Sequence, residues 1–408
     1  MGKLLVLIAA AAFMLGLNGH AEDAVTTAEK TTLANDTNAF ALDLYKTLKS
    51  GEKGNLFLSP YSISTALAMT YAGARGTTAK QMEQALHFSL GQARLHPVAS
   101  ALFVNLNAAN QNGKKRGFQL NVANRLFIQK DYTLRADFVA TTDRAYGAGV
   151  EELDFAGNTE ASRLHINKYV EQKTNERIKD LIPLNGVNAV TKLVLTNAIY
   201  FKGDWALQFK KDATANAPFH AANGDVDAPL MNQTEYFGYF ENETTQGVEL
   251  PYTGDELSMV VLLPKKADGL AELEDALTPA SLKTMLSSLV SQQVAVALPK
   301  FKMKWGTVDV AGAMQKLGMV DACSPAAADF SGITDHPNGL YIAAIFHQAF
   351  VDVNEEGTEA AAATAVVMAP RGRPPRPKVF RADRPFLFLI REKATGTILF
   401  MGRVLDPR

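Results

Sequence analysis

The chain has 408 residues, of which 47% are hydrophobic, 41 are basic and 42 are acidic, a globular composition that excludes disordered, collagen-like and coiled-coil proteins. The net charge of -1 gives no reason to expect nucleic acid or an anionic membrane surface as a partner. A single cysteine cannot form an internal disulfide, so the core must be held together by packing.

Residues 1–21 have the pattern of a signal peptide. Lys3 precedes the apolar run Leu4–Leu17, and small residues at Gly19 and Ala21 suit signal peptidase. The run is shorter than the roughly 20 residues that a membrane-spanning helix needs; a buried N-terminal helix is the alternative. We expect a secreted protein, extracellular or, in a Gram-negative source, periplasmic. Residues 22–36 are polar and rich in Ala and Thr, and are expected to form a flexible tail.

Helical and strand patterns mix along the rest of the chain. Thr77 or Thr78 is expected to cap a helix through Gln81–Ala85, and Thr278 followed by Pro279 predicts another helix start. The last two predicted strands are expected to form a hairpin. The predicted strands are Leu193–Phe201, Leu257–Leu263, Gln293–Leu298, Phe386–Ile390 and Thr397–Val404. Because helices and strands do not alternate regularly, we expect an α+β fold.

The sequence carries no catalytic signature and no metal-binding or cofactor-binding motif. It lacks a G-x-S-x-G elbow, a Walker A loop, a complete G-x-G-x-x-G and H-E-x-x-H. For Cys323, which lies among small residues, an inert thiol is favoured over a catalytic one. Lys114, Lys115 and Arg116 suit a weak contact with a polyanion such as a sulfated polysaccharide; a solvated turn is the alternative.

The segment after residue 355 has an unusual pattern. Read as a strand, it places small residues on the face that would enter a packed core, and Glu359 on the other face. A strand that enters an existing sheet needs this pattern, because large side chains would clash and charges would be desolvated. The following stretch, Ala369–Pro377, contains four prolines and three arginines and predicts an exposed, extended loop.

Several segments resemble the serpins, the family of serine protease inhibitors. The resemblance covers residues 37–408 and implies one domain, where roughly 150 residues per domain would give two or three. It implies three β-sheets, about nine helices and an exposed reactive loop over about 355–379, in a monomer that is an inhibitor and not an enzyme. The segments that carry it are Asn55–Ile63, Thr196–Trp205, Leu298–Phe301, Asp329–Ile333, Phe346–Thr364, Phe380–Phe388 and Phe400–Val404.

The resemblance also implies a mechanism. A protease attacks a bait bond in the loop and forms an acyl-enzyme, and the freed loop then inserts into the central sheet before water releases the protease. The hinge contains no proline, which favours an active inhibitor over the alternative, a non-inhibitory carrier or chaperone. A protease-type hydrolase is disfavoured by the missing motifs. The implied hinge residues are Glu356, Gly357, Thr358, Glu359, Ala360, Ala361, Ala362, Ala363 and Thr364.

The bait bond follows from counting, as in serpins that resemble antithrombin. The fifteenth residue from Gly357 is Arg371, which places the bond at Arg371–Gly372. Arg373 and Arg376 each precede proline, which makes a poor protease substrate. A protease that accepts arginine has a carboxylate in its specificity pocket, so a trypsin-like serine protease is the expected partner. A slip to Met368 would indicate an elastase-like or chymotrypsin-like target, and cysteine proteases are a further alternative.

Five other residues match the moving joint of the family. Small hydroxyls and an imidazole can exchange hydrogen-bond partners as a sheet opens, which suits the shutter beneath the parting strands. An aromatic residue occupies the top of the sheet, where the loop enters. For the histidine and the tryptophan, an ordinary core role is the alternative. The five residues are Ser59, Ser62, Asn197, His347 and, at the top, Trp205.

Overall fold

The computed structural model describes residues 24–408 except 108–109, 112–113, 116, 148, 337–338 and 359–375. Over these residues the chain forms nine α-helices and sheets of nine, six and two strands, the α+β fold that the sequence predicts. The helices are α1 (Thr27–Lys49), α2 (Pro60–Tyr71), α3 (Gly76–Ala85), α4 (Gly91–Asn107), α5 (Ala136–Tyr146), α6 (Thr159–Lys173), α7 (Leu270–Ala276), α8 (Pro279–Ser287) and α9 (Ala311–Lys316). Within the described part of the chain, no helix is long and apolar enough to cross a membrane.

The six-stranded sheet has the order β12-β13-β14-β6-β4-β5. Its two central long strands, β13 and β6, run parallel and pair directly from Ile342 and Leu193 to Phe350 and Tyr200. The strand bounds are β4 (Phe118–Gln129), β5 (Val150–Leu153), β6 (Leu193–Asp204), β12 (Phe301–Asp309), β13 (Ile342–Val353) and β14 (Gly357–Thr358).

The nine-stranded sheet has the order β1-β17-β16-β10-β9-β8-β11-β15, with β7 paired to β8. The predicted hairpin is confirmed as the antiparallel pair β16 and β17. The strands are β1 (Leu56–Leu58), β7 (Ala215–Ala221), β8 (Gly224–Glu241), β9 (Thr245–Pro251), β10 (Leu257–Pro264), β11 (Val290–Pro299), β15 (Lys378–Arg381), β16 (Phe386–Glu392) and β17 (Ile398–Val404). A separate two-stranded ribbon joins β2 (Asn110–Gln111) to β3 (Lys114–Lys115).

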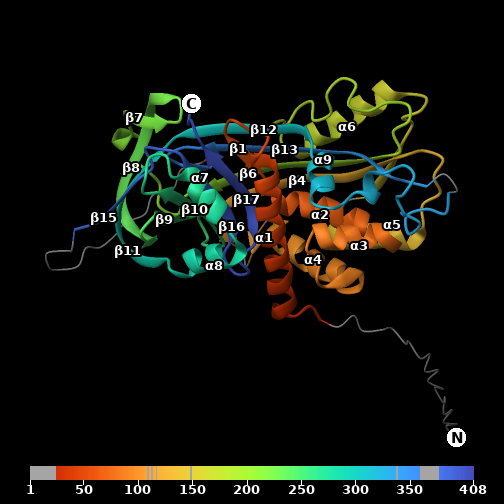
Figure 1. Cartoon of the computed structure of the whole chain (residues 1–408), viewed down its shortest axis with the longest axis horizontal. Helices are drawn as coiled ribbons and strands as arrows, with labels where there is room; N and C mark the ends of the chain where they lie inside the picture. Colours follow the sequence, from red (N-terminus) through yellow and green to blue (C-terminus); the bar gives the residue numbers. More distant parts are fainter. Residues whose placement is uncertain are drawn as a thin grey trace, which may run out of the picture.

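Helices cover both faces of the six-stranded sheet. Figure 1 shows α6 on one side of this sheet and α2 through α5 on the other. Ile166 and Val170 of α6 pack on small and apolar side chains of β4, β6 and β13, forming a minor core. The main core lies beneath the opposite face and continues between the two large sheets. The strands β13 and β6 are therefore buried on both faces.

Two local predictions are wrong and one is confirmed. The flexible tail ends earlier than predicted, because α1 begins at Thr27 with a capping box formed by Thr26 and Glu29. Helix α3 has Arg75 at its N-cap, without a side-chain cap. Thr78 does not cap it: its hydroxyl instead accepts the backbone N–H of Asp329 at 2.9 Å. Thr278 caps α8 as predicted, with Pro279 in the first helical position.

Candidate functional site

The six-stranded sheet is open at one end, where the start of the predicted reactive loop enters it. Beyond Phe350 the strands β13 and β6 no longer pair with each other, and β14 lies between them. Thr358 is opposite Gly203 of β6 and Val353 of β13, and β14 is antiparallel to both neighbours. The first two strand residues of the loop therefore already occupy the gap.

The two residues of β14 fit this gap closely. A Cβ atom on Gly357 would lie 2.1 Å from the carbonyl oxygen of Gly203, so only glycine can approach β6 in this way. Thr358 is fully buried, and its hydroxyl is 2.9 Å from the hydroxyl of Tyr252.

An ion pair between a buried carboxylate and a partly exposed ammonium anchors the turn between β13 and β14. The carboxylate of Glu355, which is 5% exposed, lies 2.9 Å from the Lys300 ammonium and accepts the Thr214 hydroxyl at 2.9 Å. Burial alone would raise the pKa of Glu355, but hydrogen bonds from Lys300 and Thr214 outweigh it, and the pKa is lowered. Glu355 is therefore ionised at neutral pH, and these partners stabilise its charge.

Trp205 contacts the same turn. Its indole N–H donates to the carbonyl of Asn354 at 3.0 Å, and its backbone N–H donates to the carbonyl of Glu356 at 3.0 Å. The ring stacks on Tyr252 with centroids 4.6 Å apart. Because Tyr252 also contacts Thr358, the two aromatic rings link the turn to the inserted residues.

A buried polar cluster lies where β13 and β6 are paired. His347 of β13 is directly opposite Asn197 of β6, and its Nδ1 is 2.5 Å from the Asn197 side-chain oxygen. The Asn197 amide donates to the Ser62 hydroxyl and to Asn124 of β4, each at 2.7 Å. Ser59 is the N-cap of α2, and its backbone N–H donates to His347 Nε2 at 3.3 Å. We call these five residues the shutter cluster.

The shutter cluster fixes the protonation of its histidine. Nε2 accepts a backbone N–H, so the proton of the neutral ring is on Nδ1, where Asn197 accepts it. Burial lowers the pKa of His347 to about 3. The hydrogen bond between His347 and Asn197 bridges the two parallel strands, and it must break if those strands separate.

The comparisons with known proteins identify the family. A model described as serpin (serine protease inhibitor) matches residues 35–407. The chain belongs to the serpin family. Human antithrombin-III is 40% identical over 92% of this chain and 82% of its own. Human leukocyte elastase inhibitor is 40% identical over 92% and 99%. The crystal structure of Serpin48, a highly specific serpin of the insect Tenebrio molitor, matches with a TM-score of 0.80 and 32% identity over 96% of this chain and all of that one.

Part of the predicted site of this serpin lies outside the described residues. This applies to the hinge from Glu359 to Thr364, to the bond Arg371–Gly372 and to Arg116. Lys114 and Lys115 form β3, and the polyanion contact stays a prediction. Burial raises the pKa of the Cys323 thiol to about 11, so the thiol is protonated at neutral pH and is a poor nucleophile.

Sequence reasoning missed three residues of the site. Asn124 is a buried polar residue in the strand β4, and such a residue within a strand pattern is a usable signal for a polar cluster. Tyr252 meets Trp205 and Thr358 from a different part of the chain, which no local pattern indicates. Glu355 is buried while its neighbour Glu356 is more exposed, and only the turn geometry separates them.

Two buried histidines, His96 and His347, predict an acid-sensitive stability for the described part of this serpin. The pKa values of His96 and His347 are lowered from 6.5 to about 4 and about 3, chiefly by burial. Above pH 6.5 both rings are neutral in both states, so they add no pH dependence. Below pH 6.5 the unfolded chain binds protons that the folded chain does not, so stability falls by about 1.4 kcal/mol per pH unit for each ring.

Thermal unfolding at pH 7.5 and pH 5 measures this effect. We expect the transition temperature to be lower at pH 5, and the drop to be smaller in His347→Gln, which retains only the contribution of His96. His165, which is exposed on α6 beside Glu151, offers the control His165→Gln, whose drop should differ little from that of the parent, because surface pairs contribute about 0–1 kcal/mol. If the transition temperature drops equally in His347→Gln and in the parent, His347 does not contribute to the acid sensitivity.

Proposed function

We propose that this serpin is secreted and inhibits trypsin-like serine proteases as a suicide substrate, cleaved at Arg371–Gly372. The observation that carries the proposal is β14, which places the first loop residues between β13 and β6, antiparallel to both. This is the geometry that complete insertion of the loop would extend. The pattern of residues 1–21 supports secretion.

Insertion is favourable in hydrogen-bonding terms. In the described state β13 and β6 share one parallel ladder along their paired residues. A strand placed between them would replace that ladder with two antiparallel ladders, which are slightly more stable per residue. Because the only cysteine is Cys323, no internal disulfide opposes the separation of the two strands.

The proposed reaction uses the chemistry of the protease. The protease serine hydroxyl attacks the carbonyl carbon of Arg371, forms an ester bond and breaks the peptide bond to Gly372. The protease histidine takes the serine proton and transfers it to the departing amine of Gly372. Hydrolysis of the ester would return active protease, so inhibition requires the loop to insert before water attacks.

The loop sequence, and not the overall similarity, supports arginine as the bait. The chain is equally similar to human antithrombin-III and to human leukocyte elastase inhibitor, at 40% identity each. Arg371 lies between Pro370 and Gly372, a sequence that favours an extended segment, and no proline follows the bond. Met368 remains the alternative bait residue, with an elastase-like or chymotrypsin-like target.

Mixing the mature protein with trypsin tests the proposal. We expect a covalent complex that survives SDS, and its loss in Arg371→Glu, because the trypsin pocket carries a carboxylate that repels glutamate. Arg373→Glu is the matched control and should retain the complex, because the bond after Arg373 precedes proline.

The other outcomes separate the alternatives. Cleavage without a complex would refute inhibition and favour a carrier or chaperone. A complex that forms only with elastase would move the bait bond to Met368, whereas a trypsin complex that persists in Arg371→Glu would move it to another arginine of the loop.

A further inference from the structure

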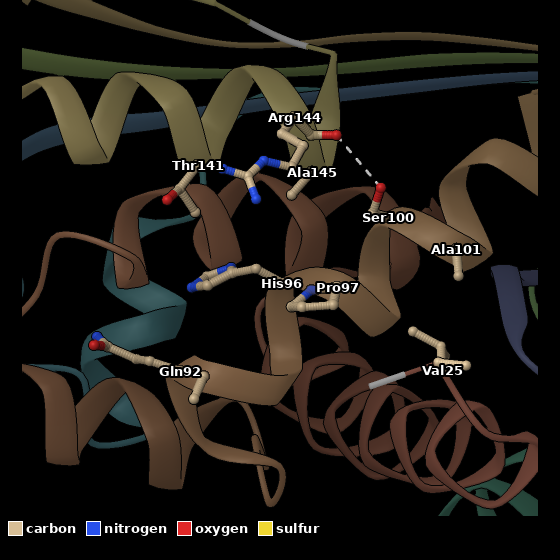
Figure 2. Close-up of a pocket in the computed structure, with 11 residues that line it drawn as sticks. Val25, Gln92, His96, Pro97, Ser100, Ala101, Thr141, Arg144 and Ala145 are labelled. Atoms are coloured by element: carbon tan, nitrogen blue, oxygen red, sulfur yellow. Dashed lines mark hydrogen bonds between the residues drawn. The ribbon is translucent and has the colours of Figure 1, made fainter. Parts of the chain in front are cut away.

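A pocket of about 590 Å³ lies between α4 and α5, bordered by the segment that precedes α1. Neither helix contributes to the hinge or to the shutter cluster. The volume lies in the range of sites for small ligands, roughly 300–1,000 Å³. The wall includes apolar side chains from Val25, Pro97, Ala101 and Ala145 (Figure 2).

Pro97 interrupts the backbone hydrogen bonding of α4 where the helix lines the pocket. Pro97 lies inside α4, and it has no backbone N–H to donate to the carbonyl of Ala93, one turn earlier. Both residues line the pocket. Ser100, one turn after Pro97, donates its hydroxyl to the carbonyl of Arg144 at 3.4 Å and so joins α4 to α5 (Figure 2).

His96 places an unused hydrogen-bond donor at this pocket. The side chain is 7% exposed, and its Nδ1 is 2.7 Å from the Tyr146 hydroxyl. Burial raises the pKa of Tyr146 and lowers that of His96 to about 4, so both groups are neutral at pH 7. If the phenol donates to Nδ1, the ring proton is on Nε2, which is buried and without a hydrogen-bond partner. A buried donor left unpaired costs about 1–3 kcal/mol.

A positive charge lies close to this donor. Figure 2 shows the guanidinium of Arg144, on α5, and the imidazole of His96, on α4, extending to the same side of the pocket. Arg144 is exposed and lines the pocket, as do the hydroxyls of Ser100 and Thr141. No aspartate or glutamate is among the described lining residues. The polar groups therefore favour an anion over a cation.

We propose that this pocket binds a small organic carboxylate with a compact apolar body. The carboxylate pairs with the Arg144 guanidinium, and one oxygen accepts the Nε2–H of His96. The apolar body packs on Val25, Pro97 and Ala101. A bound ligand joins α4 to α5 and so stabilises the folded state by mass action.

Two matched probes test the proposal, 2-naphthylacetate and the neutral 2-naphthylacetamide. Each is titrated into the mature protein labelled with ¹⁵N-histidine, and the ring nitrogen signals are followed. We expect the carboxylate to saturate, to shift the Nε2 signal of His96 and to raise the unfolding temperature. The amide should bind at least about tenfold more weakly, because a hydrogen bond to a charged group contributes about 1.5–3 kcal/mol.

Variants locate the site independently of protease inhibition. Arg144→Gln should weaken the carboxylate about tenfold and leave the amide unchanged, whereas Lys168→Gln, an exposed charge on α6, should change neither. Ala101→Trp should fill the pocket and abolish both. The proposal is overturned if the carboxylate does not saturate by about 10 mM, if both probes bind alike, or if Arg144→Gln binds the carboxylate as the parent does.

Discussion

If this serpin inhibits by the proposed mechanism, Thr358→Arg is expected to convert it from an inhibitor into a substrate. Thr358 is fully buried between β13 and β6, and an arginine there would place a charge in the core. Desolvating an unpaired charge costs several kcal/mol. The hinge should leave the sheet, and insertion should slow by more than about tenfold. Trypsin should still cleave at Arg371, but the acyl-enzyme would hydrolyse before the loop inserts.

Gel analysis of trypsin mixtures measures the ratio of covalent complex to cleaved serpin. Thr358→Ser keeps a small hydroxyl within reach of Tyr252 and is the matched control, with complex formation close to that of the parent. Loop cleavage by a protease that is not trapped should raise the unfolding temperature of the parent strongly and that of Thr358→Arg less. Full complex formation by Thr358→Arg would show that entry of residue 358 does not limit trapping.

Glu355→Lys is expected to destabilise the serpin by about 1–3 kcal/mol, because it removes a buried, hydrogen-bonded carboxylate whose partner Lys300 is itself partly exposed. The new ammonium would face Lys300 at a position that is 5% exposed. The pKa of Glu355 is lowered in the folded state, so its stabilising effect is present above the ordinary pKa of a glutamate and is lost as the pH falls below it. The turn that holds β14 should loosen, and the unfolding temperature at pH 7.5 should drop.

The double variant Glu355→Lys, Lys300→Glu is the matched test of this pair. Reversing both charges restores an ion pair, so the double variant should recover part of the lost stability, as a double-mutant cycle requires. Glu356→Lys is the control, because Glu356 pairs with Lys211 at the surface and such pairs contribute about 0–1 kcal/mol. If Glu356→Lys destabilises as much as Glu355→Lys, the buried pair does not anchor the turn.

Much of the fold could be predicted from local patterns and from the family resemblance. The start of α8 follows from Thr278 and Pro279, because a side-chain cap and a proline in the first turn both satisfy a helix start. The hairpin of β16 and β17 follows from two apolar runs and a short turn. The sequence analysis did not predict the start of α1, although Thr26 followed three residues later by Glu29 is a capping box. The alanines and threonines around these two residues have the composition of a flexible tail.

The site was less predictable because its contacts join distant segments. Ser59, Ser62, Asn197 and His347 could be proposed from the resemblance, whereas Asn124 enters the cluster only through the pairing of β4 with β6. Likewise, the choice between Glu355 and Glu356 as the buried acid depends on which side of the turn faces Lys300 and Thr214. Local propensity carries no information on such a choice.

The register of β14 also sets a length for the whole loop. Thr358 is opposite Gly203 on β6 and Val353 on β13; continued without a bulge, the same antiparallel register would bring Thr364 opposite both Asn197 and His347, which now face each other. The hydroxyl of Thr364 would then lie between Asn197 and His347, whose hydrogen bond to each other must break on insertion. In this register Met368 would be opposite Leu193, the first residue of β6, and Arg371 lies three residues after Met368.

If the loop inserts as proposed, the register of the sheet fixes which loop residue is opposite which residue of β6. Successive loop side chains then face opposite sides of the sheet, with a period of two residues. Deleting one residue between Thr358 and Thr364 would turn Thr364 and every later side chain to the opposite face, towards α6. Deleting two would preserve the faces but leave the attached protease two positions closer to the end of the sheet. Under the proposed mechanism, the length of the loop therefore determines both which face each loop side chain occupies and how far along the sheet Arg371 lies, whatever the sequence around Arg371.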